Sequence, residues 1–177
     1  MEKSLKSIAK DYGLYLGVIL SLLAVVAYAI DLNLFVNTWF GLSFYVVAIV
    51  LGIFSIAKAK QALNGYASFK ESFTAYFITI LVGMVIITLV SYILFNFIDT
   101  EAALSLKEKS IEKMVQVYEN MNLSQDNIAK AVDKLEGENL FSLKNSLISL
   151  LINYLLPLSI IGLLVAAIMK KTNPDTE

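Results

Sequence analysis

The sequence lacks three residue types on which much protein chemistry depends. Its 177 residues include no cysteine and no histidine, and all 14 basic residues are lysine, so arginine is also missing. Without cysteine and histidine, disulfides, thiol or imidazole catalysis and the usual zinc sites are excluded. Without arginine, no planar fork can bind phosphate or carboxylate through two bonds. We therefore expect no metal, no cofactor, no nucleic-acid partner and no enzymatic activity.

Charge of either sign is scarce as well. Charged residues make up 16% of the chain and hydrophobic residues 58%, and the mean hydropathy is +0.71. Soluble domains typically have about 25% charged and about 45 to 50% apolar residues. The composition therefore predicts an integral membrane protein whose main partner is the lipid bilayer.

Four stretches are apolar over about the 20 residues that a helix needs to cross a bilayer. We predict spans at residues 13–30, 39–57, 73–98 and 147–169, with a charged outer segment at 99–146. The predicted fold class is all-α, with residues 1–177 forming a single membrane domain. It is an integral membrane four-helix bundle with an extracytoplasmic helical hairpin between helices 3 and 4.

The first apolar stretch also fits a secretory signal peptide, because lysines precede it and residues 27–29, Ala-Tyr-Ala, resemble a cleavage site. However, the stretch is long for a signal sequence. Gly13, Gly17 and Ser21 repeat a small residue at every fourth position, a spacing that serves helix packing. We therefore expect the first span to be retained.

Lysines beside the spans predict the orientation. Three lysines precede the first span, three lie between the second and third spans and two follow the fourth, whereas residues 31–38 have none. Both termini should therefore be cytoplasmic. The segment 99–146 has nine acidic residues and six lysines, and so long a segment is translocated with little regard to charge.

The outer segment is expected to contain two short amphipathic helices. Apolar residues recur at helical spacing within residues 106–121, and Ser124 is placed to cap a second helix that Gly137 ends. Neither helix is stable alone, so their apolar faces should meet each other or rest on the membrane. The segment then either joins two spans as a packed hairpin or caps a site for a partner or substrate.

Polar residues inside the spans form two stripes, each on one helical face. Both stripes lie toward the outer side, and Pro157 should kink the fourth span because it leaves the Asn153 carbonyl without its helical donor. Such groups either join helices or bind a ligand. This candidate polar intramembrane cluster comprises Thr88, Ser91, Tyr92, Asn96, Ser149, Asn153 and Pro157.

Small residues gather toward the cytoplasmic side, where they allow helices to approach closely. This half of the bundle should therefore be tight and dry. No charged residue lies deep in a span, which argues against a proton pump or an ion-coupled transporter. The candidate helix-packing residues are Gly13, Gly17, Ser21, Ala48, Gly52, Gly162 and Ala166.

Several short motifs carry a family resemblance. They are GYASFKESF at residues 65–73, YILFNFID at 92–99, MNLSQDNI at 121–128 and the pair Lys170 and Lys171. With these motifs in this order, the chain resembles domain-of-unknown-function family 4199, a family of small bacterial membrane proteins. The resemblance implies a location in the bacterial inner membrane and implies no catalytic residues.

Three classes of function remain open. A structural or regulatory membrane protein, acting through a protein partner or a second copy at the outer segment or at residues 65–73, is favoured. An oligomeric channel or carrier for a small solute, with Ser149, Asn153 and Tyr92 along its path, is the alternative. A membrane enzyme using Asp99 and Glu101 is least supported, because the spacing pairs no catalytic groups.

Overall fold

The computed structural model describes residues 4–171, which are built from helices. In that range, the extended pairing consists of one isolated antiparallel bridge between Ala67 and Lys171. In chain order the elements are α1 (Leu5–Ile30), α2 (Asn33–Val36), α3 (Thr38–Ala62), α4 (Phe69–Ile93), η1 (Leu94–Ile98), α5 (Thr100–Asn120), α6 (Gln125–Glu136), α7 (Leu143–Ile148), η2 (Ser149–Leu155) and α8 (Leu156–Met169).

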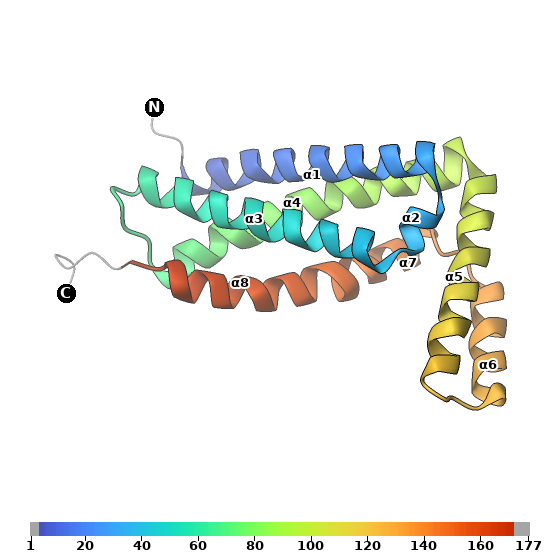
Figure 1. Ribbon diagram of the computed structural model, residues 1–177. Coiled ribbons are helices and arrows are strands. Elements are labelled where there is room, and N and C mark those ends of the chain that lie inside the picture. Colours follow the sequence, from blue (N-terminus) through green and yellow to red (C-terminus); the bar gives the residue numbers. More distant parts are fainter. Residues whose placement is uncertain (1–3, 172–177) are drawn as a thin grey trace.

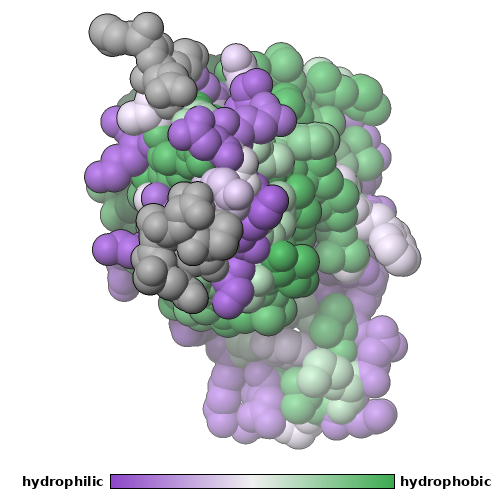
Figure 2. Space-filling model, turned by 90° about the vertical axis from the view of Figure 1, so that its left-hand side faces the viewer, coloured by the Kyte–Doolittle hydropathy of each residue, from purple (hydrophilic) through white to green (hydrophobic). Residues whose placement is uncertain are grey.

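Four helices are long and apolar enough to cross a membrane: α1, α3, α4 with η1, and α7 through α8. They lie side by side (Figure 1), and α4 contacts α1, α3 and α8. We call the end where α1 begins and α8 finishes the terminal end, and the end where α5 and α6 attach the arm end. Figure 2 views the terminal end, where polar side chains gather beside an apolar flank. The prediction of an all-helical chain with four apolar spans is confirmed.

Helix caps place the long helices beyond the predicted spans. α1 begins at Leu5, after Ser4, whose hydroxyl accepts a backbone hydrogen bond in the first turn. α4 begins with a capping box made by Ser68 and Glu71, and α7 is capped by Ser142. Hydropathy locates the apolar part of a helix, whereas the cap fixes where the helix begins. The helices therefore begin at Leu5, Phe69 and Leu143, before the apolar spans predicted to start at residues 13, 73 and 147.

Two of the spanning helices are π-helical at the arm end. η1 continues α4, and η2 lies between α7 and α8 and ends two residues before Pro157. A π-helical turn contains an extra residue, and such turns are one identifiable cause of helix distortion. The segment on the amino-terminal side of Pro157 is thus π-helical, and the kink expected at Pro157 stays a prediction.

The arm, which we define as α5 and α6, lies crosswise to the bundle at its end (Figure 1). Asp99 caps α5 by accepting a hydrogen bond from the Ala102 amide at 2.8 Å. Ala102 and Leu106 are buried against Leu94 and Phe95 of η1, forming a second small core. α6 packs on α5, as expected for two helices whose apolar faces meet.

The caps of α6 differ from the prediction. Ser124 occupies the capping position but makes no side-chain cap hydrogen bond. Gly137 follows α6 with φ of −75°, so it does not use the left-handed conformation available to glycine. The helix therefore ends where predicted without the expected glycine geometry.

At the terminal end, one aromatic ring fills the space between α3 and α8. Tyr76 of α4 is fully buried, and its ring lies between Gly52 of α3 and Gly162 of α8. A Cβ atom added at Gly162 would lie 2.5 Å from Tyr76 Cδ1, and one at Gly52 would also overlap the ring. These glycines therefore receive a large side chain from a third helix.

Glycines also shape the contact between α1 and α4. A Cβ added at Gly13 would lie 2.6 Å from Val82, and one at Gly17 would lie 2.7 Å from Ile86. In the opposite direction, Leu16 packs against Gly83. Of the other small residues, Ala48 and Ala166 are fully buried, and the Ser21 hydroxyl is buried without a hydrogen-bond partner among the described residues.

The terminal half is tight but not free of polar groups. The buried Thr79 hydroxyl lies 2.8 Å from Ser55 Oγ and 3.0 Å from the Ala9 carbonyl oxygen, which links α4 to α3 and α1. Ser72 is buried as well. The Thr79 and Ser55 hydroxyls bond within the protein and need no water, so the dry interior at this end stays a prediction.

Candidate functional site: a cleft at the arm end

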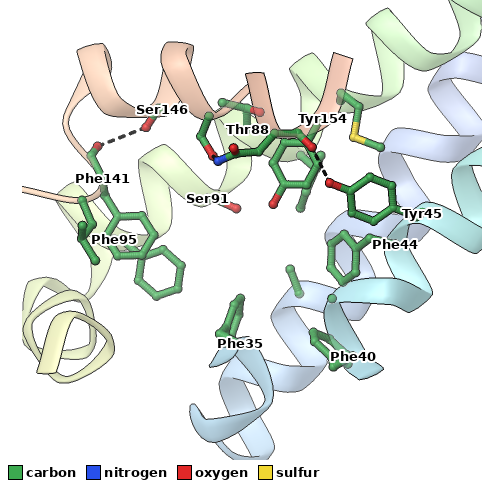
Figure 3. A pocket seen from close by; sticks show the side chains of 17 residues that line it. Phe35, Phe40, Phe44, Tyr45, Thr88, Ser91, Phe95, Phe141, Ser146 and Tyr154 are labelled. Carbon is green, nitrogen blue, oxygen red and sulfur yellow. Dashed lines mark hydrogen bonds between the residues drawn. The ribbon is translucent and has the colours of Figure 1, made fainter. Parts of the chain in front are cut away.

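A cleft of about 300 Å³ lies at the arm end between α3, α4 and the segment α7–η2. α3 packs on α8 nearer the terminal end. At the arm end, no Cα atom of α3 lies within 8 Å of a Cα atom of α7 or η2 in residues 4–171, and the cleft occupies the space between them. α2 and residues 140–141 complete its rim. Figure 3 shows the side chains around this space.

Aromatic side chains form most of the wall. Phe35 and Phe95 meet edge to face with ring centroids 5.6 Å apart, and Phe95 lies 4.3 Å from Phe141. Such ring pairs are stable apolar contacts, and Phe95, which belongs to both pairs, is buried. The aromatic lining residues are Phe35, Phe40, Phe44, Tyr45, Phe95, Phe141 and Tyr154.

A neutral polar row runs along the remaining side. It consists of Thr88 and Ser91 from α4 together with Ser146, Ser149 and Asn153 from the fourth span. Asn153 Nδ2 donates to Ser149 Oγ at 3.0 Å. Within the part of the chain that the structure describes, no hydrogen bond is made by the Thr88 hydroxyl, the Ser91 hydroxyl or Asn153 Oδ1. These three groups are available to an occupant.

At the deep end of the cleft, Tyr45 of α3 bridges to the fourth span. Its hydroxyl donates to the Asn153 carbonyl, the group that Pro157 leaves without a helical N–H donor. The second span therefore supplies the donor to this carbonyl, and Ser149 accepts the hydrogen bond of the Asn153 amide.

The structure brings four of the predicted cluster residues together in the cleft: Thr88, Ser91, Ser149 and Asn153. The other three are not among its lining residues. Asn96 Nδ2 donates to the Phe141 carbonyl at 2.8 Å and to the Tyr92 carbonyl at 2.9 Å, so it fastens the start of the fourth span to η1. Pro157 acts through the backbone, as described above.

Sequence reasoning missed the aromatic wall, Tyr45 included. The signal available was the spacing of Phe40, Phe44 and Tyr45 near the start of the second span. Aromatic residues at the ends of spans are common as membrane-interface anchors, so this pattern does not by itself indicate a cavity.

The lining can form hydrogen bonds but has little acid–base capacity. It contains hydroxyls, one carboxamide and no carboxylate or lysine. Within residues 4–171, no group of three or more acidic side chains is placed to hold a metal ion. The nearby Asp99 carboxylate accepts a hydrogen bond from the Tyr28 hydroxyl at 2.7 Å, which lowers the pKa of Asp99 from its ordinary value. This pair lies at the base of the arm, outside the cleft lining.

The four spans and the cleft between them define a multi-pass helical membrane protein. The chain belongs to the family described as protein of unknown function (DUF4199), which it matches over residues 11–171. The resemblance inferred from the short motifs is thereby confirmed. Neither a curated protein nor a solved structure matches the chain.

Proposed function

We propose that this chain is a structural or regulatory protein of the bacterial inner membrane that acts by binding a partner in the cleft, without catalysis. The observation that carries the proposal is the cleft itself, which has aromatic walls and three polar groups free to bond an occupant. Pockets of this character, mostly apolar with a few convergent polar groups, are typical ligand sites. The neutral lining supports binding over catalysis, which would require a placed nucleophile, acid or base.

The proposal includes an orientation, with both termini cytoplasmic and the arm as an extracytoplasmic hairpin. It is supported by the lysines that flank the spans on the terminal side. Single cysteines at Gln61 and Gln125 test this orientation, because the chain has no cysteine of its own. Gln61, near the end of α3, is chosen over Asn64 in the loop that follows, because the left-handed φ of Asn64, +57°, is strained for cysteine. An impermeant thiol reagent should label only the cysteine at Gln125 in intact cells, and the reverse pattern would refute the orientation.

A photo-crosslinking amino acid at Phe44 tests the binding function in native membranes. Phe44 lines the cleft, whereas Val50, farther along α3, is exposed outside it and serves as the control position. We expect a reproducible adduct, of a protein or a small molecule, from Phe44 that Val50 does not give. Identical adduct patterns from the two positions, or no adduct at all, would contradict a binding role for the cleft.

The second candidate is an oligomeric channel or carrier for a small solute. The neutral polar row favours it, because hydroxyls and amides on facing helices can line a path. A path that continues from the cleft through the bundle passes Tyr76, which fills the space between Gly52 and Gly162. A carrier should therefore expose a cysteine placed at buried Ser55 to an aqueous thiol reagent during transport, whereas a static binding protein should leave it unreactive.

A further inference from the structure

We infer that the cleft holds a membrane lipid, in the form of a slender apolar chain with an uncharged oxygen group such as an ester or hydroxyl. This inference rests on the proposed binding function and specifies the occupant. Three observations carry it: where the cleft opens, how much it can hold and which polar groups it leaves unpaired.

The cleft opens at bilayer depth on the perimeter of the bundle. Tyr45 lies seven residues into α3, and Asn153 lies ten residues after Leu143, which places the deep end about 10 to 15 Å below the arm end. A hydrocarbon core is roughly 30 Å thick. Gly41 of α3 and Asn153 of η2 line the cleft and are exposed, so the cleft opens between α3 and η2, which both pack on α4. Molecules that reach it from the side are therefore those dissolved in the bilayer.

The volume favours a chain over a protein segment. A cavity of about 300 Å³ is at the lower limit for small-molecule sites. A helix with side chains is about 10 Å across, whereas part of a single flexible lipid chain is slender enough to lie along the side chains of Phe40 and Phe44.

The unpaired polar groups favour an uncharged oxygen function on that chain. In hydrocarbon, a hydroxyl or amide without a partner is costly. The Thr88 and Ser91 hydroxyls can donate to an ester oxygen, and Asn153 Oδ1 can accept from a hydroxyl. No lysine or carboxylate lines the cleft, so a charged headgroup has no counter-ion there and stays outside.

The decisive variant is Gly41→Phe. Gly41 lines the cleft, and a Cβ added there meets nothing within 4 Å, so the new ring can occupy the cleft without displacing the fold. Val50→Phe, on the exposed surface of the same helix, is the matched control. Both variants should keep the melting temperature of the unmodified protein in detergent.

The experiment uses phosphatidylethanolamine with a photoactivatable diazirine in one acyl chain, mixed into phosphatidylethanolamine and phosphatidylglycerol vesicles that contain the protein. Mass spectrometry of peptides should find labelling at Phe40 and Phe44 severalfold above labelling at Val50. Gly41→Phe should remove this excess, and Val50→Phe should leave it intact.

Equal labelling of cleft and perimeter, or an excess that survives Gly41→Phe, would overturn the lipid assignment. Should Gly41→Phe fail to fold, Ser91→Leu provides a second way to fill the cleft and remove a free hydroxyl. The Phe44 crosslinker separates the two proposals. A protein adduct with no lipid adduct refutes the lipid and keeps the binding function, whereas no adduct refutes both.

Discussion

The distance between α3 and the fourth span differs at the two ends of the bundle, because α3 contacts α8 but not the preceding segment η2. At the terminal end, Tyr76 from α4 fills the space between them, with a glycine on each side to receive the ring. At the arm end, α4 presents Thr88 and Ser91, which are too short to fill the wider space, and a cleft remains. The comparison teaches that a small residue marks a close contact only where a large side chain arrives from a neighbouring helix.

Gly52 and Gly41 make the same point within one helix. Both lie on α3, eleven residues or about three turns apart, and hence on nearly the same face. A side chain at Gly52 would overlap Tyr76, whereas one at Gly41 would enter open space. The predictions below test this difference between the packed end and the open end.

The largest expected effect follows removal of the ring that fills the terminal end. Tyr76→Ala should lower the free energy of unfolding by about 3 to 5 kcal/mol, the range for deleting a buried aromatic side chain. Tyr76→Phe should cost nothing, because the buried hydroxyl has no hydrogen-bond partner among the described residues. Denaturant titration in bicelles measures both, and a stable Tyr76→Ala variant would show that the ring does not hold this end together.

The next effect compares the two glycines of α3 directly. Gly52→Ala should destabilise by about 1 to 3 kcal/mol, because its methyl group overlaps the Tyr76 ring. Gly41→Ala should be neutral or stabilise by about 0.5 to 1 kcal/mol, because alanine favours a helix and the methyl group meets no atom. Equal effects in thermal melts would contradict the contrast between the two ends.

A smaller effect is expected at the bridge that closes the deep end of the cleft. Tyr45→Phe removes the donor to the Asn153 carbonyl and should cost about 0.6 to 2 kcal/mol, the range for hydrogen bonds between membrane helices. Pro157→Ala restores a backbone donor to the same carbonyl, so in that background Tyr45→Phe should cost less. Tyr154→Phe is the control. Additive effects in this double-mutant cycle would disprove the link between proline and tyrosine.

The smallest effect concerns Asp99, which caps the arm. The hydrogen bond from the Tyr28 hydroxyl, and to a smaller extent that from the Ala102 amide, lowers the pKa of its carboxyl group. A carboxylate whose pKa is lower in the folded state stabilises the protein above its unfolded pKa, about 3.9. That contribution is lost as the pH falls through the lowered value. Asp99→Asn should therefore melt below the unmodified protein at pH 6, and the difference should shrink by pH 3. A constant difference would exclude this titration as its cause.

Part of this structure could be predicted from the sequence. Apolar length and helical spacing are properties of continuous segments, so they identified the four spans, the two arm helices and the polar stripe of Ser149 and Asn153. The span predictions do not mark where α1 and α4 start, because capping by Ser4 and Ser68 extends each helix beyond its apolar part.

The sequence alone is thus enough to predict the all-helical chain, its four apolar spans, its family and which residues are small or polar within each span. Folding is needed to show which glycines contact Tyr76, which hydroxyl donates to the Asn153 carbonyl and where the aromatic residues of α2, α3 and η1 come together as a wall. The physical reason is distance. Packing and hydrogen bonds act over a few ångströms, and the residues that meet across the cleft are brought within that range only by folding.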